Sequence, residues 1–394
     1  MKCRISKELV KDYIEFGKMP IANGFKKSIS QKEFTFNMKV IFGKKFSLFQ
    51  LVNFPKPEKM FGKNYPFYTS SSKFMVNHFK KYSEWLKKLL KKKKFNVCEL
   101  GSNDGTFLKN FNQNYSIGFE PSKSVHSVAV KKGINSINKF FNNKNIKSLP
   151  KKFQKYDVII GSNVFCHIPD QVNLIRTIKN SLTNNGYIIF EEPYLGSMYK
   201  KSSYDQIYDE HIYMFSVHSV SKLYKKFNFD LIDAIPQTTH GGSMRYILRH
   251  SNLKKKKSKR LRKIFQTEKD EQINSIEGFK SFKKKIEKSK IKLKKKINKI
   301  INNGEQICGY GATSKSTTIL NYCQINNKMI KCIFDTTKDK IGKYTPGTNI
   351  PIYDYKFFKK SGFKNVFLFA WNHKKEIMKK EKKLKNIKWF SHIN

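Results

Sequence analysis

The sequence predicts an α/β protein with a central, doubly wound parallel sheet of the Rossmann type. Three observations predict this fold class. Apolar strands alternate with helical stretches between residues 76 and 250, a glycine-rich turn follows the first of these strands, and a second strand–glycine–helix pattern begins at residue 306. We therefore expect a small N-terminal domain (1–75), a Rossmann-like domain (76–250), a helical connector (251–303) and a C-terminal Rossmann-like domain (304–394).

Each element follows from a local pattern. Short β-like pieces and turns fill the N-terminal segment, and a helical stretch at 74–94 leads into the central strands. The lysine-rich connector carries apolar side chains at helical spacing, which is typical of a solvated helix or helix pair. We expect strands at 33–51 (in short pieces), 97–100, 116–120, 157–162, 186–191, 331–335 and 365–371.

The composition predicts a cytoplasmic protein without a membrane segment. No apolar run approaches the roughly 20 residues that a membrane-spanning helix needs, and the N-terminus lacks the apolar region of a signal peptide. The six cysteines are scattered through apolar segments, which predicts reduced core thiols rather than a disulfide framework.

The formal net charge of +51 suggests nucleic-acid binding, but the kind of basic residue does not. Only six of the 80 basic residues are arginine, the residue favoured for forked phosphate contacts, and the lysines are spread along the whole chain. Abundant Lys, Asn, Ile and Phe suit an AT-rich coding bias. We expect attraction to anionic ligands such as nucleotide diphosphates, but no specific nucleic-acid partner.

The turn after the first central strand predicts a nucleoside-binding site. In VCELGSNDGTFL an apolar strand runs into a tight loop, after which Thr106–Asn110 can begin a helix; an ordinary β–α turn is the alternative. Glycine lets the backbone pass close to a nucleoside, and Glu120, at the end of the next strand, can accept both ribose hydroxyls. The acidic loop disfavours a pyrophosphate and suits a cationic ligand such as S-adenosylmethionine. The candidate cofactor-binding residues are Glu99, Gly101, Asn103, Asp104, Gly105, Glu120, Pro121 and Asn163.

A dense group of titratable residues follows the strand at 186–191. The sequence SSYDQIYDEHIYMFS brings Tyr208, Glu210 and His211 near the carboxyl edge of the sheet, where ligands of open α/β sheets bind. Histidine moves protons near neutral pH, and a helical turn would place Tyr208 and His211 on one face. Such a group suits proton removal from carbon beside a carbonyl. A hydrogen-bonded surface histidine is the alternative for His211.

Two further glycine turns are candidate substrate sites. In THGGSMRYIL, which contains His240, Gly241 allows close approach of a ligand, and Arg245 could make a bidentate contact with a phosphate. A glycine bulge before a strand is the alternative. The turn GYGATSK, which contains Tyr310 and Lys315, suggests a second nucleotide-bearing ligand, and a purely structural duplicate is the other interpretation.

In order and spacing these motifs resemble those of the S-adenosylmethionine-dependent sugar C-methyltransferases that modify nucleotide-linked 4-keto deoxyhexoses, of the dTDP-sugar C-3 type. The resemblance covers nearly the whole chain. It implies a class I methyltransferase domain between a small zinc-binding-type domain and a C-terminal Rossmann-like domain. It rests on PIANGF, YPFYTSSS, ELGSNDGTFL, GFEPS, SNVFCHIPD, YDQIYDEHIYMFS, HGGSMR, GYGATSKSTTILNY and GKYTPGTNIPI.

The resemblance also implies a mechanism. The C-4 ketone acidifies the C-3 proton of the sugar, an enzymic base removes it, and the enolate attacks the sulfonium methyl group. His211 matches the base, with Glu210 and Tyr208 beside it, and Tyr65 matches a tyrosine that reaches the sugar, with Tyr68 as second choice. The segments GYGATSK and GTNIPI would help hold the nucleotide-diphosphate sugar, whose product would serve surface-glycan assembly.

One departure from the family concerns zinc. The family carries four cysteines in two close pairs in its N-terminal domain, whereas this chain has Cys3, with Ser6 at the partner position, and no cysteine pair between Glu33 and Gln50. Structural zinc needs four ligands, so we expect no zinc and a domain held by packing.

Two other functions stay open. The cofactor domain could methylate oxygen or nitrogen of another substrate, including tRNA, or the chain could be a non-enzymatic nucleotide- or RNA-binding protein. We expect a monomer.

Overall fold

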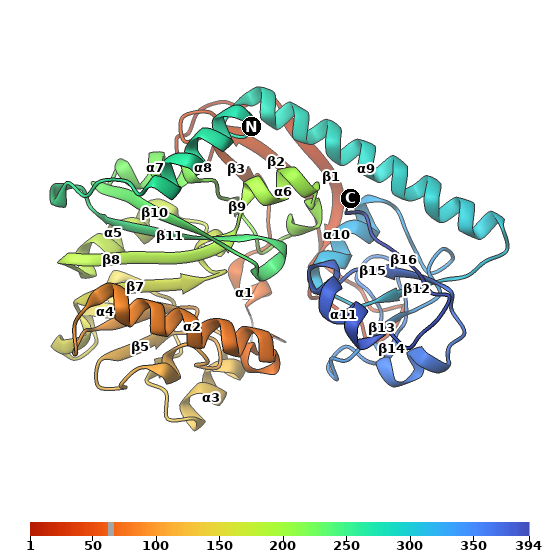
Figure 1. The fold of residues 1–394 in the computed structure, drawn as a ribbon, viewed down its shortest axis with the longest axis horizontal. Helices are drawn as coiled ribbons and strands as arrows, with labels where there is room; N and C mark the ends of the chain where they lie inside the picture. The colour runs from red at the N-terminus through yellow and green to blue at the C-terminus, as the bar shows by residue number, and fades with distance from the viewer. Residues whose placement is uncertain (62–66, 394) are drawn as a thin grey trace.

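The computed structural model of the protein describes residues 1–61 and 67–393. Within these residues the strands form three sheets, one in each part of the chain. Figure 1 shows the central sheet on the left, the C-terminal sheet on the right, and the strands β1–β3 of the N-terminal sheet above and between them. The long helix α9 (Ile276–Asn302) runs across the top toward the C-terminal part.

The central sheet contains seven strands in the order β10-β11-β8-β7-β4-β5-β6. The strands from β8 to β6 pair in parallel, which confirms the expected doubly wound sheet, whereas β11 pairs antiparallel with β8 and β10 with β11. The sheet is therefore mixed, because two antiparallel strands complete one edge. Its strands are β4 (Val97–Leu100), β5 (Ser116–Phe119), β6 (Ser136–Ile137), β7 (Tyr156–Ser162), β8 (Leu182–Pro193), β10 (Phe229–Gln237) and β11 (Ser243–His250).

Both faces of this sheet are buried. On β7, Val158 and Ile160 join an apolar cluster with α2 and α3, whereas Ile159 joins a second cluster with α5 and α7. Successive side chains of a strand point to opposite faces, so this alternation supplies a core on each side. The helices of this part are α2 (Lys73–Leu90), α3 (Lys123–Lys131), α4 (Asn143–Lys147), α5 (Gln171–Ser181), α6 (Leu195–Lys201) and α7 (Val217–Lys225).

The prediction that a helix begins at Thr106–Asn110 is wrong. The segment forms only a short 3-10 turn, Leu108–Asn110. The side chain of Asn110 donates hydrogen bonds to the carbonyl oxygens of Thr106 (3.3 Å) and Phe107 (2.9 Å), which a continuing helix would use for its own backbone.

The N-terminal sheet takes its fourth strand from the central part of the chain. Strands β1 (Tyr13–Pro20), β2 (Thr35–Gly43) and β3 (Leu48–Leu51) form an antiparallel meander, α1 (Pro57–Met60) follows it, and β9 (Tyr213–Met214) pairs with β3. The Leu51 N–H also donates to the Ile212 carbonyl at 2.8 Å. The chain directly after His211 is thus fixed on the N-terminal sheet.

Hydrogen bonds surround Cys3, where the family resemblance implies metal ligands. The Cys3 sulfur is buried and accepts from Gln50 Nε2 (3.0 Å) and from the Ser6 N–H (3.5 Å). The Ser6 hydroxyl in turn donates to Glu8 at 2.9 Å. The turn is therefore closed by a hydrogen-bond network around a single thiol.

The C-terminal sheet is parallel, in the order β14-β13-β12-β15-β16. Helix α10 (Ser314–Tyr322) begins after the glycine turn that follows β12, and Thr313 caps it by accepting from the Ser316 N–H. Helices α8 (Lys259–Asp270) and α9 connect this part to the central sheet, as expected. The remaining elements are β12 (Ile307–Tyr310), β13 (Ile333–Asp335), β14 (Ile352–Asp354), β15 (Asn365–Leu368), α11 (Lys374–Lys380) and β16 (Lys388–Phe390).

All six cysteines are buried and free, which agrees with the expected core thiols. Among the helices of residues 1–61 and 67–393, none combines the length and the apolar character that crossing a membrane requires.

Candidate active site

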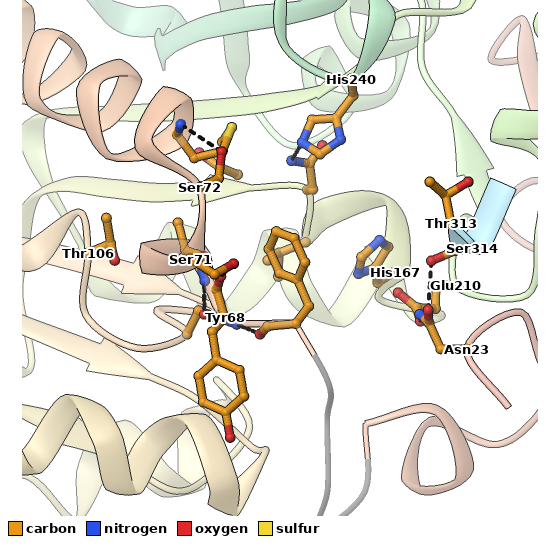
Figure 2. A pocket seen from close by; sticks show the side chains of 18 of the residues that line it. Asn23, Tyr68, Ser71, Ser72, Thr106, His167, Glu210, His240, Thr313 and Ser314 are labelled. Carbon is orange, nitrogen blue, oxygen red and sulfur yellow. Dashed lines mark hydrogen bonds between the residues drawn. The ribbon is translucent and has the colours of Figure 1, made fainter. Parts of the chain in front are cut away.

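A cavity of about 1000 Å³ lies where the three parts of the chain meet. Its wall includes the turn after β4, the loop around His211, Asn23 of the N-terminal part and the start of α10. In Figure 2, His167 and His240 lie at this pocket, and Asn23, Glu210 and Ser314 gather at one side of it. The carboxyl ends of the parallel strands β4, β5 and β7 open on the cavity, as in other open α/β sheets.

Two buried carboxyl groups form one end of the cavity. Glu120 accepts the backbone N–H groups of Asn103 (3.0 Å) and Ser122 (2.7 Å), and burial raises its pKa in spite of these bonds. Glu99 lies beside it, and burial together with the charges of Glu120 and Asp104 raises the pKa of Glu99 well above its usual range. Within the described residues Glu99 Oε2 has no hydrogen-bond partner. An orphaned carboxyl oxygen beside a cavity fits the cationic end of a ligand such as S-adenosylmethionine.

Six of the eight predicted cofactor residues line the cavity: Glu99, Gly101, Asn103, Glu120, Pro121 and Asn163.

Asp104 and Gly105 require a correction, because they lie outside the cavity wall. Asp104 is fully buried and accepts from the Thr106 hydroxyl (2.6 Å) and the Ser70 N–H (3.0 Å), which ties the loop to the preceding segment. Gly105 has φ +75°, and a Cβ atom there would lie 2.6 Å from Ile134. Both residues shape the turn rather than face a ligand.

His211 is a buried, neutral imidazole in the cavity wall. Its Nδ1 lies 2.7 Å from the Gln206 carbonyl oxygen. Because a carbonyl can only accept, Nδ1 carries the proton and Nε2 carries the lone pair. Burial lowers the pKa of His211 to about 3, so the ring is uncharged near pH 7.

The neighbours of His211 are those that the sequence predicted. The rings of Tyr208 and His211 lie 4.1 Å apart, and the His211 N–H donates to the Tyr208 carbonyl across a tight turn. Glu210 accepts from Asn23 Nδ2 at 2.8 Å, and Asn23 Oδ1 accepts from the Ser314 hydroxyl at 2.8 Å (Figure 2).

Asn23 was not predicted as a site residue, although it lies in the motif PIANGF. Its amide bridges Glu210, in the loop that carries His211, and Ser314 at the start of α10, a contact between segments that lie far apart in the chain. Tyr65 lies outside the described residues, so its predicted role stays a prediction, and Tyr68 lines the cavity.

His240, predicted as a substrate residue, lines the cavity and pairs with a predicted cofactor residue. Its Nε2 lies 2.8 Å from Asn163 Nδ2, which makes Nε2 the acceptor. His167, placed between His211 and Phe61 by ring contacts of 5.3 and 5.5 Å, also lines the cavity. Burial lowers the pKa of both His167 and His240 well below the usual range, so three neutral imidazoles share the site.

Arg245 and Gly241 require a second correction, because neither lines the cavity. The Arg245 guanidinium is buried and pairs with Glu191 at 2.6 and 2.7 Å, over the ring of Tyr82. The predicted phosphate contact is therefore replaced by an internal ion pair. A Cβ atom at Gly241 would lie 2.1 Å from Trp371, so this glycine leaves room for a tryptophan rather than for a ligand.

The C-terminal part supplies a polar wall. Lys315 is buried on α10, its Nζ lies 3.4 Å from the His240 carbonyl, and burial lowers its pKa to about 8, so it is charged at pH 7. Tyr310 also lines the cavity, and its hydroxyl donates to Glu381 at 2.9 Å. Lys340 and His373 line the same wall, and nothing local in the sequence distinguished them from the many other basic residues.

Cys166, His167 and His211 place a sulfur and two ring nitrogens within 4.8 Å of one another. Metal binding by cysteine requires the thiolate. Burial, with the charge of Glu192, raises the pKa of the Cys166 thiol well above its usual range, so without a metal ion the thiol keeps its proton. The cluster offers three donors, one fewer than a structural zinc site uses.

Comparison with known families matches two consecutive parts of the chain. The family described as a methyltransferase domain matches residues 76–234, and the family described as the C-methyltransferase C-terminal domain matches residues 238–390. Among curated proteins, the chain is similar to the C-methyltransferase NovU of Streptomyces niveus, with 24% identity over 376 residues, 94% of this chain and 89% of that protein.

Solved structures with similarity to the chain include the magnesium protoporphyrin IX methyltransferase ChlM of Synechocystis with bound SAH, at 15% identity and a TM-score of 0.35, over 44% of this chain and 83% of that one. An S-adenosylmethionine-dependent methyltransferase of Clostridium acetobutylicum is similar at 15% identity and a TM-score of 0.35, over 44% and 92% of the two chains.

The central domain is thus a Rossmann-like class I methyltransferase domain, and residues 238–390 match the family described as the C-methyltransferase C-terminal domain. The protein is an S-adenosylmethionine-dependent methyltransferase, as its matches to the two families indicate.

Proposed function

We propose that this methyltransferase transfers its methyl group to the carbon beside the ketone of a nucleotide-linked 4-keto-deoxysugar. The observation that carries the proposal is His211, whose Nε2 holds the lone pair in the wall of a cavity that extends from Glu120 to Lys315. The relative from Streptomyces niveus is a C-methyltransferase, which supports carbon as the acceptor atom.

In the proposed reaction, His211 Nε2 takes the proton from the carbon next to the ketone, and the electron pair of the broken C–H bond forms the enolate. The bound sulfonium cofactor supplies an electrophilic methyl group, so that a C–C bond forms as the C–S bond breaks. Tyr208, beside His211, would donate a hydrogen bond to the enolate oxygen. A positioned base of this kind contributes about 10²–10⁴-fold to the rate.

The cofactor would lie along the turn after β4. Glu120 keeps lone pairs for the ribose hydroxyls beyond its two backbone N–H bonds, because an ionised carboxylate offers about four acceptor sites. The orphaned oxygen of Glu99 would accept from the ammonium group of the methionine moiety, whose positive charge would favour the ionised carboxylate over the neutral form that burial favours in its absence. Asn163 and Pro121 complete this end of the cavity.

The diphosphate would lie against the C-terminal domain. Lys315 provides a positive charge that burial does not remove at pH 7, and the start of α10 at Ser314 adds the positive end of a helix dipole. Asn23 would hold these two elements in register with the catalytic loop. The domain limits at residues 75, 250 and 303 belong to this proposal.

The test supplies the protein with a cofactor labelled with ¹³C in the methyl group and a panel of nucleotide-diphosphate 4-ketosugars that differ in base. The expected product carries the label in a new C–C bond beside the ketone, and the His211→Asn protein gives none. Label found on oxygen or nitrogen, or transferred to RNA instead of a sugar, would overturn the proposal.

A further inference from the structure

A short turn outside the cavity carries the atom that orients His211. The carbonyl that accepts from His211 Nδ1 belongs to Gln206, the last residue of the 3-10 turn Tyr204–Gln206. Asp205 lies in the middle of this turn, is 1% exposed and does not line the cavity. Its carboxylate therefore needs partners inside the protein.

Those partners come from the C-terminal part of the chain. The Trp371 Nε1–H donates to Asp205 Oδ2 at 2.6 Å, and His392 Nε2 lies 3.2 Å from Asp205 Oδ1. The His392 ring also packs on Tyr204, with ring centres 5.3 Å apart, and its carbonyl accepts from Ser289 on α9 at 3.2 Å.

Asp205 is charged in these surroundings. Burial by itself raises its pKa, but the neighbouring His392, the charge of Lys315 and the Trp371 N–H outweigh burial and lower the pKa below its usual value. A buried charge with several partners holds its backbone firmly, because leaving any partner unpaired is costly.

The same contacts reach the loop that carries His240. Trp371 fills the space that Gly241 leaves open, and Gln206 Nε2 donates to the His240 carbonyl. Lys315 Nζ approaches the same carbonyl at 3.4 Å. The loops that carry His211 and His240 are therefore both held against one tryptophan of the C-terminal part.

We propose that Asp205, Trp371 and His392 form an interdomain latch that positions His211 through the Gln206 carbonyl. The three are positioning residues, since neither Asp205 nor its two partners line the cavity. The C-terminal domain would thus contribute to proton transfer as well as to substrate binding. The inference rests on the proposed role of His211.

The test uses the full-length protein with ¹⁵N-labelled histidine and the variants His392→Ala and Trp371→Phe. The His211 signals are assigned by their loss in His211→Asn. The wild-type ring should show only the Nδ1-protonated tautomer, and both variants should add the Nε2-protonated tautomer. In the same variants kcat should fall about tenfold while KM for the nucleotide sugar changes less than twofold, and His392→Asn, which keeps an N–H donor, should recover most of kcat.

His218→Ala is the matched control. It removes another histidine–carboxylate pair, the half-buried His218 with the buried Glu268 at 2.7 Å, that lies outside the cavity. This variant should lose stability but keep the wild-type His211 tautomer and kcat. If both latch variants are folded by circular dichroism and keep the wild-type tautomer and kcat, the latch is refuted. A shifted tautomer in a protein that methylates no ketosugar supports the latch and refutes the proposed function instead.

Discussion

The hydrogen bond from His211 Nδ1 to Gln206 decides which ring nitrogen can act as a base. The hydrogen-bond partners of the other predicted residues likewise decide which of them can contact a ligand. Glu99 and Glu120 keep carboxyl oxygens toward the cavity, whereas Asp104 and Arg245 use their polar atoms on internal partners. Residue type and spacing placed the first pair at the cavity, and their role in cofactor binding stays a prediction. They failed for the second pair because a buried partner cannot be seen in a local sequence pattern.

Glu120→Ala should raise the Kd for S-adenosylmethionine by about 10–100-fold, the range expected for losing charged hydrogen bonds of about 1.5–3 kcal/mol. Turnover at saturating cofactor should change less, because Glu120 lies at the ribose end of the proposed site. Isothermal titration measures the affinity, with the half-buried Glu305→Ala, outside the cavity, as control. Unchanged affinity would remove the ribose role.

Arg245→Leu should lower the free energy of unfolding by about 3–5 kcal/mol, because it leaves Glu191 buried without its main cationic partner. KM for the nucleotide sugar should stay the same. Urea unfolding and steady-state kinetics check the two effects, and the double variant Glu191→Leu/Arg245→Leu should regain part of the lost stability. A raised KM with unchanged stability would instead restore the phosphate contact predicted from the sequence.

Elements with strong local patterns were predictable. The strands β4, β5, β7 and β8, the helix α2 and the connector helices lie where alternation and helical spacing placed them. The short strand β9 was not predictable, because two residues pair with a strand more than 150 positions earlier and tertiary contacts decide such pairing. The sequence also did not predict that β10 and β11 form a hairpin whose second strand pairs antiparallel with β8 at the edge of the central sheet.

The turn around Cys3 should be stable without metal. Elemental analysis of the purified protein should find no stoichiometric zinc, and chelators should leave the melting temperature unchanged. Gln50→Ala should lower the free energy of unfolding by about 1–3 kcal/mol, because it removes the donor to the Cys3 sulfur and the acceptor for the Arg4 N–H. The exposed Gln31→Ala is the control. One equivalent of zinc per chain would show that other ligands hold a metal there.

At the scale of the whole molecule, the active site exists only because three sheets meet. The central sheet supplies the cofactor turn and His211, the N-terminal part supplies Asn23 and the strand that fixes the chain after His211, and the C-terminal part supplies Lys315 and the latch (Figure 1). The sequence predicted strands in each of these three parts of the chain, where the structure has them. It could not indicate that Asp205 and His392 meet, since no local pattern links them.

The buried histidines make the stability of the whole molecule depend on pH. In the folded protein the pKa of His211 is depressed to about 3. Between pH 6.5 and pH 3, His211 is therefore protonated in the unfolded chain and neutral in the folded chain. Stability contributed by the neutral ring is present above pH 6.5 and is lost as the pH falls. When the pH is lowered from 7.5 to 5.0, the free energy of unfolding of the His211→Asn protein should therefore fall by about 2 kcal/mol less than that of the wild type. Equal losses in urea unfolding at the two pH values would place the charged form of His211 inside the folded protein.

Proton removal by His211 is tested most directly by hydrogen exchange at the carbon beside the ketone, followed by NMR in D₂O with a nucleotide-diphosphate 4-ketosugar. The wild-type protein should exchange this hydrogen for deuterium. The His211→Asn protein should stay folded, bind S-adenosylmethionine with wild-type affinity and exchange at least 10²-fold more slowly. Exchange at the wild-type rate in that variant would contradict the assignment of His211 as the base.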